Sequence, residues 1–160
     1  MVKFYTHSGV HTLLVEQELP VGRMKLWEFL SKPQNLSEIT PRDMGFQVTS
    51  PVLSGQMYPG QIITYYVFPF KGIRTCWVTE ITHVQEGWYF VDEQRFGPYR
   101  FWHHKHFLGE AENGVRMTDE VTYKLPMGFI GRWINRLLVK KRLKQIFEYR
   151  QQVFQDYFGS

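Results

Sequence analysis

The chain contains almost no cysteine: Cys76 is the single one among its 160 residues. One cysteine excludes an internal disulfide framework and a metal site built from several thiolates. Because Cys76 lies in a predicted strand, we interpret it as a small buried hydrophobic residue rather than a redox centre.

Long hydrophobic runs are also missing. The longest mainly apolar run, Ile62 to Phe70, has nine residues, whereas a membrane-spanning helix needs about 20. The first residues, MVKFYTHSGVHTLLVE, contain no apolar block of the kind found in signal peptides. We therefore expect a soluble, cytoplasmic protein in a reducing compartment.

Repeats, low-complexity stretches and linkers are absent from the sequence, which predicts a single domain over 1–160. Charged residues make up 21% and apolar residues 43%, a composition typical of a globular protein. The net charge of +4 is too small to indicate nucleic-acid binding by itself.

Aromatic residues are abundant, at 17% of the chain. Such large side chains either fill a core or line a pocket for a flat or apolar ligand. The sequence leaves both alternatives open, including a cavity that the aromatic side chains make small or closed.

Alternating apolar residues predict a strand at 10–19 and six further strands at about 45–50, 61–68, 72–84, 87–96, 99–108 and 115–125. Two short helices are expected after the first strand, one containing Met24, Trp27 and Leu30 and one near 35–39. Strands joined by short hairpins are antiparallel.

Apolar residues at helical spacing predict one long helix from Phe129 to Phe158. The predicted stripe comprises Ile130, Trp133, Ile134, Leu137, Leu138, Ile146, Phe147, Val153, Phe154 and Tyr157. Only this helix is long enough to cover the apolar face of the sheet. We therefore expect an α+β helix-grip fold, with a curved seven-stranded antiparallel sheet wrapped on the C-terminal helix. The cavity between them should hold about 300 Å³ or more and be lined by 61–68, 87–96, 99–108 and 115–125.

Polar residues interrupt the apolar face of the last two strands, which the Asn113-Gly114 signal predicts to form a hairpin. His104 and His106 share one face of the first strand with Trp102. On the second strand, Asp119 shares a face with Val115, Met117, Val121, Tyr123 and Leu125. Because an unpaired buried charge is costly, we expect Asp119 to pair with His104, His106 or Arg100.

This polar set has several interpretations. The favoured one is a structural lock between strands; the others are polar anchoring of a ligand and acid–base catalysis by a histidine that a carboxylate orients. His104, His106 and Asp119, with His103 between the other histidines, could also ligate zinc or iron. Without a motif of fixed spacing, we expect no metal and no cofactor.

The chain resembles the START-like (SRPBCC) superfamily of ligand-binding domains, which includes polyketide cyclases and aromatases. The motifs that carry the resemblance are Asn35-Leu36 through Thr40-Pro41, Gly97-Pro98-Tyr99-Arg100 with Trp102, His104 and His106, Thr118-Asp119 with Val121 and Tyr123, Leu125-Pro126 with Gly128 and Gly131, and Ile146 through Arg150. They span essentially the whole chain and are most similar to a bacterial branch often labelled "cell division inhibitor". That label is not carried over, because nothing in these residues indicates it.

The resemblance implies that a small hydrophobic molecule, aromatic or acyl, binds in the hollow. The residues expected to contact it are Tyr65, Trp88, Phe90, Trp102, His104, His106, Met117, Asp119 and Tyr123. A cyclase- or aromatase-like enzyme that uses a His/Asp pair in the same hollow is the alternative function.

Basic residues gather on the C-terminal helix: Arg132, Arg136, Lys140, Lys141, Arg142 and Lys144. The favoured interpretation is a solvated helix face. The alternative is an interaction surface for anionic lipid headgroups or an acidic partner. No nucleic-acid-binding motif accompanies the charge, so we expect no nucleic-acid partner.

Overall fold

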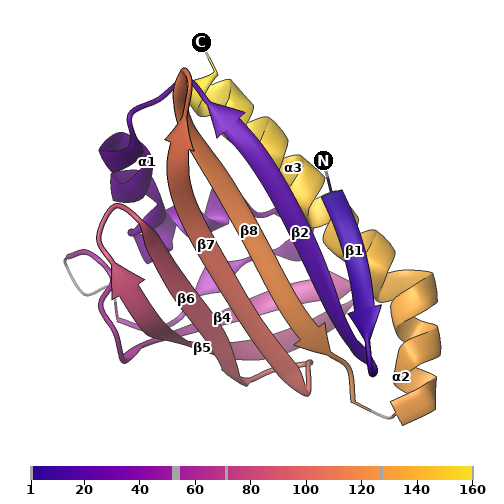
Figure 1. The fold of residues 1–160 in the computed structure, drawn as a ribbon. Coiled ribbons are helices and arrows are strands. Elements are labelled where there is room, and N and C mark those ends of the chain that lie inside the picture. The colour runs from indigo at the N-terminus through magenta and orange to yellow at the C-terminus, as the bar shows by residue number, and fades with distance from the viewer. Residues whose placement is uncertain (1, 52–54, 71, 127, 160) are drawn as a thin grey trace.

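The computed structural model describes residues 2–51, 55–70, 72–126 and 128–159. Its main element is an eight-stranded antiparallel sheet with the strand order β1-β2-β8-β7-β6-β5-β4-β3 (Figure 1). The strands are β1 (Val2–His7), β2 (Val10–Leu19), β3 (Gln47–Val48), β4 (Gln61–Phe70), β5 (Ile73–Gln85), β6 (Tyr89–Phe96), β7 (Phe101–Ala111) and β8 (Gly114–Lys124).

Two helical sections accompany the sheet. The first links β2 to β3 through α1 (Arg23–Leu30) and the 3-10 helices η1 (Pro33–Ser37) and η2 (Arg42–Met44). The second, at the C-terminus, consists of α2 (Gly128–Ile134), a π-helical turn η3 (Asn135–Val139) and α3 (Lys140–Phe158). Figure 1 shows α3 running alongside β1 and β2. The α+β helix-grip architecture is confirmed. Among the described residues, the helices are too short or too polar to cross a membrane.

The eighth strand, β1, was not predicted. It pairs with β2 through a tight turn at Ser8 and Gly9, whose φ angles are 50° and 76°, as a two-residue hairpin turn requires. β1 is an edge strand with most of its side chains exposed, and only Val2 and Phe4 are half-buried. The alternation of apolar residues in β1 is therefore too short to predict a strand from the sequence.

The strand predicted at 45–50 is much shorter in the structure, where β3 contains only Gln47 and Val48. Gly45 ends η2 in the left-handed region, with φ 50°. After β3, the amides of Thr49 and Ser50 both donate to the carbonyl of Thr64. Because two successive amides share one carbonyl, the regular hydrogen-bond pairing of β3 with β4 ends here.

The predicted hairpin of β7 and β8 is confirmed, and it aligns the polar residues. Gly114 has φ 133°, and a Cβ there would collide with the Leu19 carbonyl, so only glycine fits. In the resulting register His106 lies opposite Asp119, and on the other side of β7 His104 lies opposite Asp92 of β6.

The predicted apolar stripe of the C-terminal helix is wrong in its first half. The buried positions are Gly131, Asn135, Val139, Leu143 and Phe147, followed by Arg150, Phe154 and Phe158. The first five recur every four residues, a spacing that drifts around a regular α-helix by about 40° per step. The π turn η3 holds more residues per turn, which keeps these positions on one face.

Large apolar side chains are consequently exposed at the start of this section. They are Phe129 (66% exposed), Ile130 (47%), Trp133 (65%), Leu137 (62%) and Leu138 (54%). We call these five residues the apolar patch. The side chain of Arg132 lies outside what the structure describes.

The sheet bends strongly at β4, β5 and β6. Register shifts occur between Val67 and Phe70, between Val78 and Thr79, and between Ile81 and His83. Such bulges bend a strand and increase its twist, which leaves a hollow between this part of the sheet and the helices. Cys76, on β5, is half-buried rather than buried.

Candidate functional site

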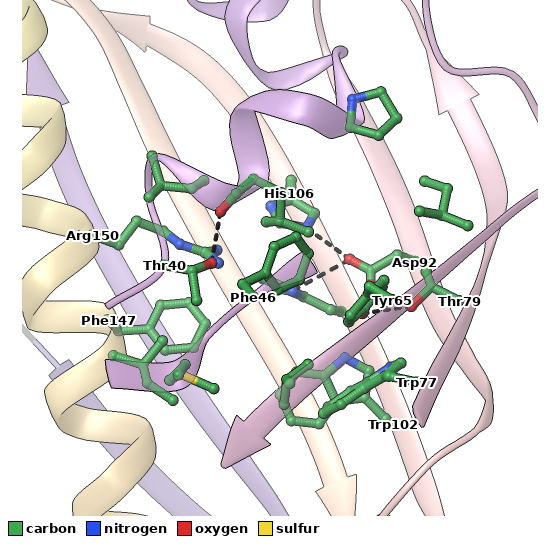
Figure 2. Close-up of a pocket in the computed structure, with 18 of the residues that line it drawn as sticks. Thr40, Phe46, Tyr65, Trp77, Thr79, Asp92, Trp102, His106, Phe147 and Arg150 are labelled. Atoms are coloured by element: carbon green, nitrogen blue, oxygen red, sulfur yellow. Dashed lines mark hydrogen bonds and ion pairs between the residues drawn. The ribbon is translucent and has the colours of Figure 1, made fainter. Parts of the chain in front are cut away.

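A cavity lies between strands β4 to β7, the η1–η2 section and α3. Figure 2 shows Arg150 and Phe147 reaching it from α3, with Tyr65, Trp77 and Asp92 on the strands opposite. Its volume is about 170 Å³, so the predicted volume of 300 Å³ or more is wrong.

Aromatic side chains account for the small volume. Tyr65 stacks on Trp77 at 5.9 Å, and Trp77 meets Trp102 edge-on at 5.2 Å. Tyr99 lies against Trp102 at 4.7 Å. Part of the hollow is thus filled by the protein itself, and the remaining space is bounded by flat aromatic surfaces.

The structure brings five of the residues predicted to bind a ligand to the cavity wall: Tyr65, Phe90, Trp102, His104 and His106. Trp88 lies elsewhere. It sits in the turn before β6, 43% exposed, with the Arg23 guanidinium 3.6 Å above its ring.

Three further predicted residues, Met117, Asp119 and Tyr123, are buried but do not line the cavity. All three lie on β8, whose inner face is covered by the C-terminal helical section. The Tyr123 hydroxyl, for example, donates to the Asn135 Oδ1 atom on η3 at 2.9 Å. The prediction that 115–125 lines the cavity is therefore wrong.

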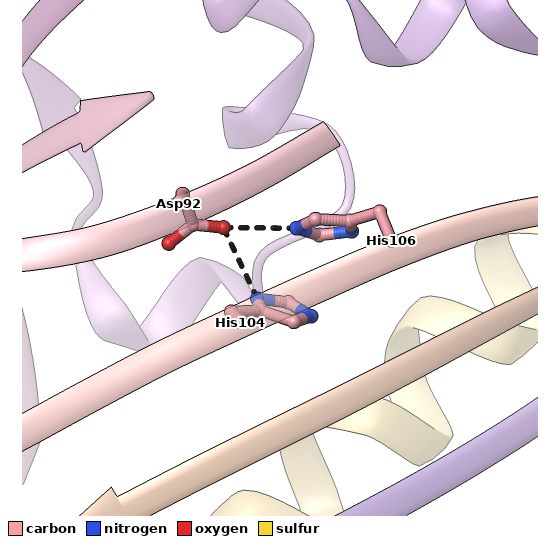
Figure 3. Close-up of side chains that lie close together, drawn as sticks. All are labelled: Asp92, His104 and His106. Carbon is pink, nitrogen blue, oxygen red and sulfur yellow. Dashed lines mark hydrogen bonds and ion pairs between the residues drawn. The ribbon is translucent and has the colours of Figure 1, made fainter. Parts of the chain in front are cut away.

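Two histidines and two aspartates form a closed cluster at the cavity wall, where each imidazole lies between two carboxylates. His104 Nε2 is 3.0 Å from Asp119 Oδ1, and His104 Nδ1 is 3.3 Å from Asp92 Oδ2. His106 Nε2 is 2.9 Å from the same Asp92 oxygen (Figure 3). His106 Nδ1 is 2.8 Å from Asp119 Oδ1. The last contact lacks hydrogen-bond geometry. The predicted pairing of buried Asp119 with a histidine is confirmed.

Two members of this site were missed in the sequence. Asp92 lies two residues after Phe90 on β6 and points to the same face, the same alternation that identified Asp119. Arg150 follows Phe147 by three residues and precedes Phe154 by four, which places it on the buried stripe of α3. Arg100, the third partner considered for Asp119, is exposed.

Arg150 carries a buried positive charge with few partners. Only 7% of the residue is exposed. Its Nη1 atom lies 3.9 Å from Asp119 Oδ1, its guanidinium lies 4.9 Å from the Phe147 ring centroid, and its Nε atom has no partner among the described residues. A guanidinium with spare donors at a cavity wall can bind an acceptor on a ligand.

Burial and mutual contacts shift the ionisation of the cluster. Burial opposes ionisation of Asp119 and Asp92, but the nearby histidines outweigh it and hold the pKa of both carboxyls below its usual range. Burial and the charge of His106 lower the pKa of His104. Burial also acts against protonation of His106, but its contacts with Asp119 and Asp92 prevail and raise its pKa. An imidazole at this wall can therefore hold or pass a proton.

A second hydrogen bond lies beside the cluster. Tyr65 and Thr79, which both line the cavity, share a hydrogen bond of 2.9 Å between their hydroxyl groups. Burial and the charge of Asp92 raise the pKa of Tyr65, so this phenol is a neutral hydrogen-bonding group.

The chain is similar in structure to many solved proteins. Protein Ms6760 from Mycobacterium smegmatis aligns with a TM-score of 0.68 and 16% identity over 98% of each chain. TTHA0849 from Thermus thermophilus aligns with a TM-score of 0.69 and 14% identity over 91% of this chain and 94% of that one. Ara h 8.0201, a Bet v 1-like protein with a START-type fold, aligns with a TM-score of 0.59 and 19% identity over 92% and 99%.

These identities establish the fold and nothing finer. No protein-family model matches the chain, and no curated protein matches it. The START-type fold is thus shared.

Proposed function

We propose that the protein binds a small aromatic molecule with one polar group in the cavity between sheet and helix. The observation that carries this proposal is an apolar, aromatic-lined cavity with an ionised cluster on its wall. Ligand sites typically combine mostly apolar walls with a few placed polar groups.

The volume sets the size of the ligand. A cavity of about 150 Å³ is enough for benzene, so 170 Å³ accommodates one aromatic ring with small substituents. An extended acyl chain would require the walls to move apart. Volume therefore favours the aromatic alternative over the acyl one.

The polar groups set the orientation. Asp92, His106 and Arg150 line the cavity together with Tyr65 and Thr79, whereas Trp77 and Trp102 offer flat apolar surfaces. We expect the ring to lie against the tryptophans and its polar substituent to face Arg150.

Titration with toluene, phenol and benzoate, followed by two-dimensional amide NMR, tests this proposal. At least one probe should shift the amide resonances of the cavity residues, and the shifts should reach saturation as the probe concentration rises. Ile63→Trp, which fills the cavity from β4, should abolish the effect. Ile62→Trp is the matched control, because Ile62 is next to Ile63 on the same strand but points outward and is 48% exposed. Absence of a saturable shift with all three probes would reject the proposal.

The apolar patch favours a second function: docking on an anionic membrane surface. The same helical section carries exposed cations, with Arg136 within the span of the patch and Lys140, Lys141 and Lys144 after it. No acidic residue occurs from 128 to 147. Exposed aromatic and aliphatic side chains next to cations suit an anionic bilayer interface, and the charge pattern argues against a basic partner.

Co-sedimentation with vesicles of phosphatidylcholine and phosphatidylglycerol tests this second function. The parent should sediment with the vesicles, and the double variant Trp133→Ser, Leu137→Ser should not. The control Ile73→Ser, Phe96→Ser removes two equally exposed apolar residues (58% and 66%) outside the patch and should sediment normally. Failure of the parent to sediment with the vesicles would overturn this function. It would also be overturned if the parent were a dimer in solution and the Trp133→Ser, Leu137→Ser variant a monomer, because the patch would then be a dimer interface.

A further inference from the structure

We propose that Asp92, His104 and His106 form a binding site for a divalent transition metal ion, with Asp119 as the carboxylate that orients His104. The inference goes beyond the binding of an aromatic ligand and does not depend on it, because the ion could bind in an otherwise empty cavity.

The spacing of the three donor atoms fits a metal ion. Each of the three residues offers one ligand atom, and these atoms all lie within 4.8 Å of one another. Asp92 Oδ2 is 3.3 Å from His104 Nδ1 and 2.9 Å from His106 Nε2. Bonds of about 2.0–2.1 Å to zinc place neighbouring ligand atoms roughly 2.9–3.3 Å apart for angles between octahedral and tetrahedral. Small movements of these side chains would thus be enough to admit an ion (Figure 3).

The outward nitrogens of both histidines face the same carboxylate. His104 Nε2 and His106 Nδ1 lie 3.0 Å and 2.8 Å from Asp119 Oδ1. Histidine ligands usually give their second ring nitrogen to a carboxylate, which fixes the tautomer and the ring orientation. Buried Asp119 occupies that position for His104, with which it forms a hydrogen bond, and it lies beside the His106 Nδ1 atom without hydrogen-bond geometry.

Hydrogen counting leaves a lone pair that a cation can use. A neutral imidazole carries one N–H. When His104 Nε2 donates to Asp119 and His106 Nε2 donates to Asp92, the lone pair of His104 Nδ1 faces an Asp92 oxygen 3.3 Å away. A metal ion between the three donors would replace the His106 Nε2 proton and relieve this contact.

The rest of the site supports an ion that keeps an open position. All three donors line the cavity, so water or a ligand atom could complete the coordination. Two imidazoles and one carboxylate suit zinc and iron(II), and three protein ligands with an open position are typical of reactive rather than structural sites. The positive charge of Arg150, beside Asp119, offsets the second carboxylate.

Cobalt(II) titration of the untagged, chelator-treated protein tests this inference, with visible absorption reporting coordination and elemental analysis reporting the amount bound. The parent should bind one equivalent, and zinc should displace it. His104→Ala and Asp92→Asn should lose binding. Asp119→Asn should bind 10- to 100-fold more weakly, as expected for a carboxylate that orients ligands.

The same two strands provide a matched control on their outer face. His103 and Glu93 are opposite each other and 2.7 Å apart, so His103→Ala and Glu93→Gln remove a similar pair and should leave binding unchanged. A thermal midpoint that zinc raises in the parent, but not in His104→Ala, would separate lost binding from lost folding. The proposal would be overturned if the parent failed to bind cobalt(II) stoichiometrically, or if binding survived His104→Ala and Asp92→Asn. Either result is independent of whether toluene, phenol or benzoate binds.

Discussion

Asp119 on β8 and His104 on β7 form a buried pair, with 3.0 Å between the Asp119 Oδ1 and His104 Nε2 atoms and less than 5% of either residue exposed. The carboxylate also lies 2.8 Å from His106 and 3.9 Å from Arg150. Asp119 is therefore the common neighbour of both imidazoles and of the Arg150 guanidinium.

Removing that carboxylate should destabilise the fold. In Asp119→Ala the imidazoles would lose one of their two carboxylates and Arg150 would remain buried without its counter-charge, and we expect the free energy of unfolding to fall by about 3 kcal/mol. Urea unfolding of the variant and the parent measures this. Glu120→Ala is the control, because Glu120 pairs with Lys105 at 2.9 Å on the outer face of the same strands and should cost far less. Equal midpoints for Asp119→Ala and the parent would contradict the prediction.

Phe147 should contribute strongly to the docking of α3. It is 2% exposed and packs edge-on against His104, with 5.7 Å between ring centroids. Phe147→Ala should therefore cost about 3–5 kcal/mol. Trp133→Ala, which removes a larger side chain that is 65% exposed, should have little effect in the same urea experiment. A comparable loss for both variants would show that the apolar patch is packed in solution.

The contrast between Phe147 and Trp133 also shows what periodicity could predict. The pattern indicated a long amphipathic helix correctly, because both residues fit a 3.6-residue repeat. It could not indicate the π turn, which rotates the helix surface and exposes Trp133 and Leu137. Asn135 in that turn makes a tertiary contact, because its side-chain oxygen accepts a hydrogen bond of 2.9 Å from Tyr123, and local spacing in the sequence does not indicate tertiary contacts.

The site was predictable only in part for a similar reason. Alternation along β7 and β8 was enough to place His104, His106 and Asp119 on inner faces and to pair them. Asp92 shares that alternation on β6, but its register opposite His104 depends on the geometry of the connection between β6 and β7, which the turn signal alone does not determine. The cavity size depends on how Trp77 and Trp102 pack, which neither composition nor pattern determines.

Tyr123 should be important for the π turn. The Tyr123 hydroxyl donates to the buried Asn135 amide oxygen, and Asn135 is only 5% exposed. Tyr123→Phe should leave this oxygen unsatisfied and cost about 1–3 kcal/mol. Thermal unfolding measures the loss, and Tyr157→Phe, at a tyrosine that is 55% exposed, serves as the control. A neutral Tyr123→Phe variant would indicate that the turn forms without this bond.

The lysines next to the apolar patch should matter for vesicle binding and not for folding. Lys140, Lys141 and Lys144 are exposed, and Lys144 has only a surface ion pair with Glu148 at 3.6 Å. Reversing all three to Glu should change the free energy of unfolding by no more than about 1 kcal/mol. The same change should weaken co-sedimentation with anionic vesicles at low salt. Unchanged sedimentation would assign any membrane binding to the apolar side chains alone.

His11 should make stability depend on pH. It is 8% exposed on β2, contacts Thr6 Oγ1 through Nδ1 at 2.9 Å, and lies 5.4 Å from the Tyr123 ring. Burial, and secondarily the charge of Lys140, lower the pKa of His11. The unfolded chain, with a pKa of about 6.5, then binds a proton more readily than the folded protein does. Stability contributed by neutral His11 is present above pH 6.5 and is lost as the pH falls through the lowered pKa.

Replacing His11 with Gln should remove that contribution. Urea unfolding of the parent and of His11→Gln at several values between about pH 5 and 7.5 gives the difference in their free energies of unfolding, in which the titrations of the other groups cancel. Relative to the variant, the parent should lose stability as the pH falls. His7→Gln, at an exposed histidine on the neighbouring strand, should follow the parent. A constant difference between parent and His11→Gln would mean that His11 titrates alike in the folded and unfolded chains.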